Sequence, residues 1–282
     1  PLVYDVEDRE QQTAYTQLLT HIVSNILRND GFSFHDMTEL LPTETGDEVP
    51  HEALEAIVAG LTKVSIKQFR RLSPETQREK LIYYGETGIY RVLYGTRGRH
   101  RPKRFAGFNQ LAFLSSGVIR YFQEFLGVAY HLTFPSGEAP RNPLVLPAKS
   151  QTDSVHFVSQ HNLTTLSRNV EADGERLKYF LLDLGDCLRF KLLNHTSEPE
   201  AGRLTIADPE MLDSEGYAEL RRILSVGARE GVFQTKEGRP AFKPKHSSDP
   251  QPSEFNICRV FAPVLQISPR QRWRTKVTCE DL

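Results

Sequence analysis

The stretch RLTIADPEMLDSEGYAELRRILSVGAREGVF, residues 203–233, contains the signals on which the fold prediction rests. Residues 204–206 are a short apolar run of the kind that forms a strand. Asp208-Pro209 is a helix start, with Asp at the cap and Pro at the first helical position. Residues 217–230 repeat apolar side chains at helical spacing until Gly231 ends the helix. The stretch therefore predicts a strand, a helix and a longer helix, in that order.

The flanking segments complete this pattern. A strongly amphipathic helix is predicted before it, over residues 174–195. Two β-type segments follow it, over 232–242 and 255–267, and a short last strand is expected over 273–278. A helix, a strand, two further helices and a hairpin follow one another in the order of a winged helix-turn-helix domain, which we place at 153–282.

The first half of the chain is predicted to be all-helical. Apolar residues recur at helical spacing over 9–28 and over 108–132, where Ser115-Ser116-Gly117 indicates a break between two helices. Residues 135–152, which are rich in Pro, read as a linker. Residues 1–134 would then form a helical domain. The expected fold class is mainly α, a helical domain followed by a winged helix with a small hairpin or sheet.

Composition places the chain among globular proteins. Its 282 residues carry a net charge of −1, with 39% hydrophobic and 25% charged residues, and suit two domains of ordinary size. Because its net charge is near zero, the protein as a whole does not attract nucleic acid or acidic lipid, so any basic surface must be local. Cys187, Cys258 and Cys279 are odd in number and far apart, which favours reduced thiols. No apolar run approaches a membrane span. We therefore expect a cytoplasmic protein without membrane contact.

The sequence lacks the common catalytic motifs. It has no phosphate loop of the G-x-x-x-x-G-K-[ST] type, no G-x-S-x-G elbow, no H-E-x-x-H and no dinucleotide-binding G-x-G-x-x-G. Its nine histidines are scattered, without a neighbour at a spacing that would suggest a metal site. We therefore predict no catalytic residue and no metal site.

The segment Leu114-Ser115-Ser116-Gly117-Val118-Ile119-Arg120 resembles the sensor-2 segment of AAA+ ATPases. In those proteins an Arg in the first turn of a lid helix reaches the terminal phosphate of ATP on the neighbouring core domain. A guanidinium suits a phosphate because it is planar, always charged and rich in donors. The resemblance implies that Gly117 and Arg120 sense nucleotide. Val118 departs from the commoner Asn or Asp, and an ordinary surface or capping arginine is the alternative interpretation.

A wider resemblance covers most of residues 100–282. Phe105-Ala106-Gly107-Phe108 and the closing stretch 255–274 are similar to the bacterial branch of origin-recognition-like AAA+ ATPases. In that family an ATPase core precedes a helical lid, and a winged helix ends the chain. The resemblance implies a lid-type domain at 1–134. It also implies that ATP and Mg²⁺ are held by a core before Pro1 or on another chain, and that this chain alone binds neither.

A winged helix commonly places its third helix in the major groove of DNA, while the wing touches phosphate. The candidate DNA-binding residues are Arg221, Arg222 and Arg229 on this helix, Lys236 and Arg239 in the wing, and Arg99, Arg101, Lys103 and Arg104 in a separate basic run. Acidic residues lie on the same elements, so a solvated charged face is the alternative.

The leading hypothesis is the regulatory part of an ATP-driven switch that binds duplex DNA or a protein partner. It would act with an AAA+ core or neighbouring subunits, and so within an oligomer, in replication, mobile-element control or defence. The alternatives are a stand-alone winged-helix regulator and a purely structural adaptor. A phosphate-loop domain upstream of Pro1 would distinguish the first from the other two.

Overall fold

A computed structural model describes residues 8–32, 36–43, 48–95, 102–137, 144–170, 172–195, 200–234 and 254–282. The α-helices are α1 (Arg9–Asn29), α2 (Met37–Leu40), α3 (His51–Leu61), α4 (Ile66–Phe69), α5 (Pro74–Tyr94), α6 (Phe108–Leu114), α7 (Ile119–Thr133), α8 (Ala148–Asn169), α9 (Gly174–Asn194), α10 (Ala218–Arg229) and α11 (Ala262–Leu265). The strands are β1 (Ala201–Ile206), β2 (Phe233–Gln234), β3 (Glu254–Ile257) and β4 (Trp273–Val277). The prediction of a mainly helical fold with a small sheet in the second half is confirmed.

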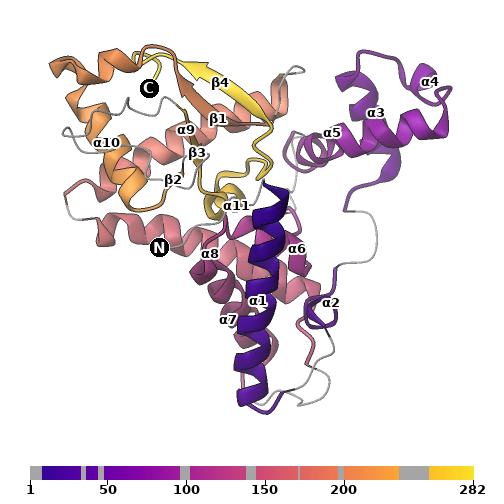
Figure 1. Ribbon diagram of the computed structural model, residues 1–282. Coiled ribbons are helices and arrows are strands. Elements are labelled where there is room, and N and C mark those ends of the chain that lie inside the picture. The colour runs from indigo at the N-terminus through magenta and orange to yellow at the C-terminus, as the bar shows by residue number, and fades with distance from the viewer. Residues whose placement is uncertain are drawn as a thin grey trace.

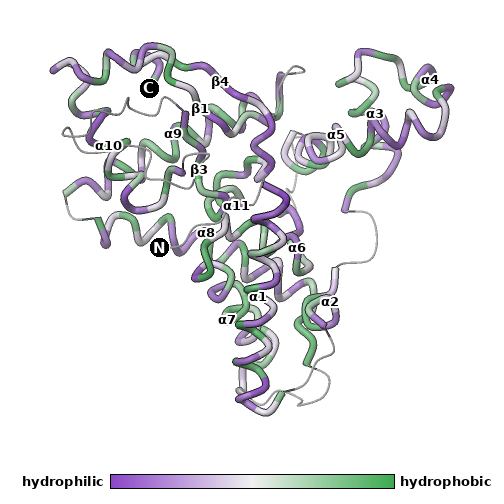
Figure 2. The backbone as a smooth tube through the Cα atoms, in the orientation of Figure 1, coloured by the Kyte–Doolittle hydropathy of each residue, from purple (hydrophilic) through white to green (hydrophobic). Residues whose placement is uncertain are grey.

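The helices and the sheet form three regions (Figure 1). Helices α1, α2, α6, α7 and α8 form a bundle, and α9 and α10 lie with the sheet. Helices α3, α4 and α5 stand to one side. Figure 2 shows hydrophobic segments gathered where α6, α7, α8 and α11 meet. One buried cluster joins the bundle to the sheet, a small one lies within α3–α5, and another joins α5 to Leu192 of α9.

The bundle helices follow their apolar stripes. Helix α1 buries Tyr15, Leu19 and Val23, which are four residues apart and therefore share one face. The carboxylate of Asp8 accepts a hydrogen bond from the Gln11 amide at 2.9 Å and so caps its first turn. Local sequence thus determines where this helix begins and which face it buries.

Helix α8 lies at the centre of the fold and was not predicted from the sequence. It packs against α7 on one side and α9 on the other. Its first residues, 148–152, fall inside the predicted linker, which is corrected accordingly. The helix escaped notice because much of its buried face is polar rather than apolar, so no hydrophobic period marks it. The buried residues are Gln151, Thr152, Ser154, Val155, Val158, Ser159, Leu163 and Leu166.

The buried amide of Gln151 connects three segments. Its Nε2 donates to the carbonyl oxygens of Pro42 at 3.0 Å and Leu146 at 2.7 Å. Its Oε1 accepts from the Gly107 amide at 2.7 Å. Gly107 has a φ of 99°, a left-handed conformation that suits glycine. One side chain therefore satisfies backbone groups that would otherwise be buried without partners.

The small sheet has the order β2-β3-β1-β4. Strand β3 pairs antiparallel with β1 and with β2, and β4 pairs parallel with β1 at the edge. Leu204, Ile206, Phe255 and Ile257 are buried on the face turned toward the helices. Helix α9 precedes β1, and α10 lies between β1 and β2 as predicted, but the first of the two helices predicted between these strands is replaced by 3-10 segments.

Two local predictions were wrong. Residues 255–267 form a strand only as far as Ile257, followed by a 3-10 turn over 259–261 and α11. Pro263 lies in the first turn of α11, where its missing N–H is tolerated, whereas in a strand it would interrupt the ladder. Asp208-Pro209 starts a 3-10 helix, Pro209–Asp213, and the Asp208 carboxylate accepts from the Cys279 amide instead of capping it.

The buried cluster contains residues from both predicted domains. Leu111 and Phe125 of the first half belong to it together with Leu204 and Phe255 of the second. Packing therefore marks no boundary between the two halves, and the division into 1–134 and 153–282 stays a prediction.

Replacing Gln151 with Leu should strongly destabilise the protein. The Gly107 amide and the Pro42 and Leu146 carbonyls would lose their partner, and each buried unsatisfied group costs about 1–3 kcal/mol. We expect the free energy of unfolding in urea to fall by about 3 kcal/mol or more. Gln160→Leu, on the exposed face of the same helix, is the control and should change it by about 0.5 kcal/mol or less. Similar losses in the two variants would contradict this account of Gln151.

Candidate nucleotide-sensing and DNA-contact sites

Arg120 lies in the first turn of α7, directly after the turn that joins α6 to α7. Ser116 and Gly117 in this turn have φ angles of 54° and 74°, both left-handed. Glycine adopts such an angle readily, and the two residues together reverse the chain before α7 begins. The left-handed backbone of this turn therefore explains why residue 117 is a glycine, and the turn places Arg120 at a helix start.

The Arg120 side chain projects into solvent. It is 68% exposed, its Nε lies 3.4 Å from the Glu124 carboxylate one turn later, and its guanidinium lies 5.1 Å from the centre of the Tyr121 ring. An exposed pair at this spacing contributes only about 0.3–0.5 kcal/mol. Arg120 could therefore leave Glu124 at small cost to contact an external anion.

The two serines beside Arg120 are buried and hold this turn in place. The Ser115 hydroxyl donates to the Ala112 carbonyl at 2.7 Å, so it accepts from the Tyr15 hydroxyl of α1 at 2.8 Å. The Ser116 hydroxyl accepts from the Arg259 amide at 2.7 Å. In the sequence, these serines indicate only a helix break. Nothing local in the sequence indicates their distant partners.

The three arginines of α10 are engaged with acids or carbonyls. Arg222 Nε lies 2.9 Å from the Asp173 carboxylate, and Arg229 Nε lies 2.9 Å from Glu230. Arg221 donates to the Leu212 carbonyl at 2.8 Å and only 24% of its side chain is exposed. Phosphate contacts by this helix would compete with these interactions. Lys236 and Arg239 of the predicted wing lie outside the described residues.

The basic run before residue 105 is not a continuous exposed patch. Arg99 and Arg101 lie outside the described residues. Lys103 is buried, with only 4% of its side chain exposed, and its Nζ lies 2.8 Å from Glu48 and 3.5 Å from Glu86. The Arg104 amide donates to Glu48. The assignment of Lys103 to a phosphate-binding patch is therefore corrected, because two carboxylates enclose its ammonium group.

Lys103 stays charged despite its burial. Burial by itself lowers the pKa of its ammonium group, but Glu86 and Glu48 outweigh burial and raise it. Glu86 belongs to α5, whereas Lys103 belongs to the segment that leads into α6. The ion pairs thus attach the α3–α5 region to the rest of the protein.

Replacing Lys103 with Met should strongly lower the free energy of unfolding, because these ion pairs attach the α3–α5 region. The substitution leaves two mostly buried carboxylates without their cation, and breaking a buried pair in this way costs about 3–5 kcal/mol. We expect a loss of that size in urea-induced unfolding. Lys149→Met removes a pair in which the lysine is 87% exposed, and it should cost about 0.5 kcal/mol or less. Equal effects would refute the structural role of Lys103.

Glu200 is a second buried charge at the same junction. Its side chain is 2% exposed and lies 3.4 Å from Arg272 Nε. Burial raises the pKa of Glu200 to about 7, with Arg272 and Arg270 opposing the rise and Glu86 adding to it. Arg272 also donates to the Tyr83 carbonyl of α5 at 2.9 Å. Glu200 directly precedes β1, and Arg272 directly precedes β4. Glu200 therefore ionises where α5 meets the starts of these two strands.

The free energy of unfolding should fall as the pH rises from the pKa of Glu200 in the unfolded chain to its pKa in the folded protein. The unfolded chain loses this proton near 4.5, whereas the folded protein keeps it until about 7. The stabilisation is thus full below pH 4.5 and is lost by about pH 7. Glu200→Gln should flatten the pH dependence of the unfolding free energy over this window. Glu175→Gln, exposed on α9, is the control, and an unchanged slope in Glu200→Gln would contradict the assignment.

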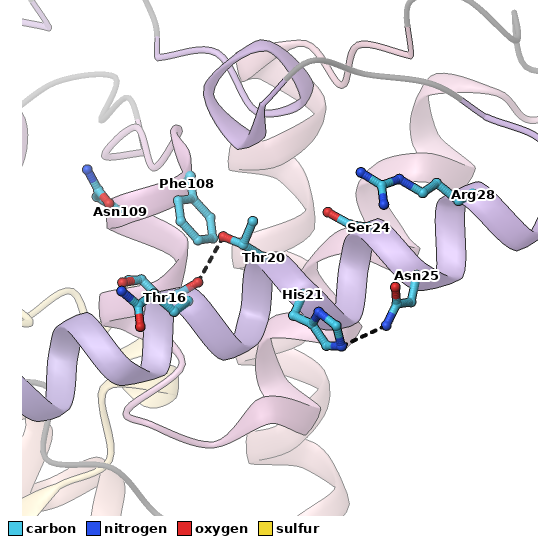
Figure 3. Close-up of a pocket in the computed structure, with 9 residues that line it drawn as sticks. Thr16, Thr20, His21, Ser24, Asn25, Arg28, Phe108 and Asn109 are labelled. Carbon is cyan, nitrogen blue, oxygen red and sulfur yellow. Dashed lines mark hydrogen bonds between the residues drawn. The ribbon is translucent and has the colours of Figure 1, made fainter.

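A polar hollow of about 460 Å³ lies along α1 beside the start of α6 (Figure 3). The His21 ring and the Asn25 amide hydrogen-bond to each other at 2.9 Å, and Thr20 donates to the Thr16 carbonyl. Arg28 at one end is the charged member of the lining, and Phe108 provides an apolar contact. The sequence pattern of α1 indicates only its apolar face and gives no sign of this hollow. The hollow offers hydrogen bonds, but no pair suited to nucleophilic or acid–base catalysis.

Neither metal binding nor disulfide formation is indicated in the part of the chain that the structure describes. Within it, no three His, Cys, Asp or Glu side chains are grouped to bind a metal ion. Cys187 is exposed, Cys258 and Cys279 are buried, and all three are free thiols. None of the helices in the described ranges combines the length and apolar character that crossing a membrane requires.

The helical region and the mixed sheet after it define a mainly α-helical protein in which lid-type helices precede a small hairpin-bearing sheet. A protein-family model described as ORC-CDC6-like matches residues 67–277. The chain belongs to this family, and the expected likeness to origin-recognition-like proteins is confirmed. No curated protein and no solved structure matches the chain.

Proposed function

We propose that this chain is the regulatory lid and winged-helix portion of an origin-recognition-like AAA+ switch that binds duplex DNA. The observation that carries the proposal is the order α9, β1, two 3-10 segments (Pro209–Asp213 and Glu215–Tyr217), α10, β2 and β3, with β3 between β2 and β1 in the sheet. A winged helix has a helix, a strand, two helices and a hairpin in this order, and here the 3-10 segments stand in the place of the second helix. Membership of the ORC-CDC6-like family supports the same assignment.

Arg120 would be the nucleotide-sensing residue. Its exposed position at the start of α7 fits a contact to a phosphate held by another domain. The residues around it are hydroxyls and apolar groups already used in packing, so they do not form a nucleotide site by themselves. ATP and Mg²⁺ would be held by an ATPase core, and Arg120 would contribute one contact when the core and these helices close together.

In the complete ATPase, Arg120→Ala should lower ATP turnover by roughly tenfold or more, because one charged contact to the reacting phosphate is lost. ATP affinity and steady-state hydrolysis are the measurements. Arg120→Lys keeps the charge and should retain part of the activity. Arg168→Ala, at the exposed end of α8, is the matched control and should hydrolyse ATP at the normal rate. If Arg120→Ala leaves both affinity and turnover unchanged, the sensor assignment is wrong.

A protein-binding adaptor is the second candidate. It is favoured by one observation, namely that the exposed charges of α10 are already paired, Arg222 with Asp173 and Glu219 with Arg176. A helix face neutralised in this way suits a protein contact at least as well as a DNA groove. On that interpretation the Arg120 substitution would not change ATP turnover.

A further inference from the structure

We propose that the tip of the α3–α5 region, residues 63–71, binds the phosphate backbone of duplex DNA through Lys67 and Arg71. This inference rests on the proposed function, because it concerns a chain that binds duplex DNA, and it adds a contact surface outside the winged helix. Neither residue is among the DNA contacts predicted from the sequence. The tip contains α4 and lies at the outer end of the α3–α5 region in Figure 1.

Local hydrogen bonds and one buried ring hold the tip in a defined shape. The Ser65 hydroxyl accepts from the Gln68 amide at 3.3 Å, and the side-chain oxygen of Gln68 accepts from the Ser65 amide at 2.9 Å. This capping box starts α4. Phe69 is fully buried and packs with apolar side chains of α3 and α5. The short helix is therefore fixed on its inner side, and its outer side faces solvent in one orientation.

Lys67 and Arg71 share this outer side. The backbone amides of residues 70 and 71 donate to carbonyls three or four residues earlier, at 3.0 and 3.1 Å, so the helical path continues past α4. Ile66, Phe69 and Leu72 belong to the inner apolar cluster. At about 100° per residue, Lys67 and Arg71 lie opposite these three, one turn apart, with Cβ atoms roughly 6 Å from each other. Both residues are exposed, so both can reach one external partner.

The charge of the tip is positive and, at these two residues, free of ion pairs. Residues 55–74 contain four cations and one acid, Glu55, which gives a formal sum of 4 − 1 = +3. Glu55 is used by Arg70, whose guanidinium lies 3.0 Å away. Within the ranges that the structure describes, neither Lys67 nor Arg71 forms an ion pair. Like charges one turn apart repel each other, so an anion bound between them would stabilise both. The arginines of α10, by contrast, are each engaged.

Other charged groups lie around the two cations. Lys63 is exposed and follows the end of α3 in a left-handed conformation, with a φ of 56°. A cation at a helix C-terminus complements the helix dipole, so α3 by itself explains Lys63 and the argument does not depend on it. Glu52 and Glu75 of the flanking helices are exposed, and among the described residues neither forms an ion pair with Lys67 or Arg71. No acid therefore occupies the proposed anion site.

The side chains of the tip favour duplex DNA over other polyanions. Binding to a membrane surface needs apolar side chains that insert between lipids, but Val64, Ile66, Phe69 and Leu72 all belong to the inner cluster. Single-stranded nucleic acid is bound through exposed aromatic rings on which bases stack, and Phe69, the one aromatic residue of the tip, is buried. A duplex needs only cations that contact its phosphates. Such contacts position DNA without reading its sequence.

The experiment uses the 282-residue chain and a fluorescein-labelled duplex of about 25 base pairs, with anisotropy measured at several salt concentrations. Lys67→Gln/Arg71→Gln should bind roughly tenfold more weakly at low salt, and the slope of log affinity against log salt should fall in magnitude by about 2, because two phosphate contacts are lost. Arg9→Gln/Arg28→Gln removes two exposed cations from α1 and gives the same net charge, −1 − 2 = −3, but should bind as the wild type does. Lys67→Arg/Arg71→Lys should retain both the affinity and the slope.

Four results would overturn the inference. Wild-type affinity and slope in Lys67→Gln/Arg71→Gln would remove the contact from the tip, and a loss in Arg222→Gln/Arg229→Gln in the same assay would place it on α10 and leave the proposed function intact. An equal loss in the α1 variant would show attraction by general charge only. Sedimentation with phosphatidylserine-containing vesicles that is lost in the tip variant, at unchanged DNA affinity, would assign the tip to a membrane surface. Absence of salt-dependent binding by the wild type would instead refute DNA binding itself. Circular dichroism and thermal unfolding verify that each variant is folded.

Discussion

The fold depends on the buried polar face of α8, a helix that must satisfy its neighbours' backbone groups as well as pack against them. Gln151 serves three backbone groups, and Thr152 both accepts from the Phe105 amide at 3.1 Å and donates to its carbonyl at 3.2 Å. Ser159 accepts from the Val264 amide at 3.0 Å. Hydrogen bonds of this kind have strict geometry, whereas apolar contacts tolerate sliding. Helix α8 therefore fixes the positions of the segment before α6 and of α11 together.

A second consequence concerns communication between the two proposed functional ends. The turn that presents Arg120 is joined through Ser116 to the Arg259 amide. The Arg259 side chain is buried, donates to the Pro269 carbonyl at 3.1 Å and lies 4.5 Å from the centre of the Phe113 ring. Arg259 lies two positions after Ile257, the last residue of β3. Any displacement of the first turn of α7 would thus act on the sheet through a short chain of buried contacts, as coupling between a nucleotide sensor and a DNA-binding surface requires.

Sequence patterns predicted the elements whose buried faces are apolar, such as α1, α7 and α9, and the strand at β4. They failed where burial is polar. Helix α8 buries Gln, Thr and Ser, and Lys103 looked like part of an exposed basic run until Glu48 and Glu86 enclosed it. Such partners can be far away in the sequence, as with Tyr15 and Ser115, which are 100 residues apart. A linear pattern contains no information on which distant group will satisfy a buried polar atom. Arg120 and Gly117 could be named from the sequence only through the resemblance to the sensor-2 segment, and their role stays a prediction.

Arg274 and Lys276 lie on β4, which forms one edge of the sheet. Edge strands commonly carry charges that prevent pairing with another sheet, and this explains two long cations on so short a strand. A charge of either sign protects an edge, so the explanation requires charge at these positions but not positive charge.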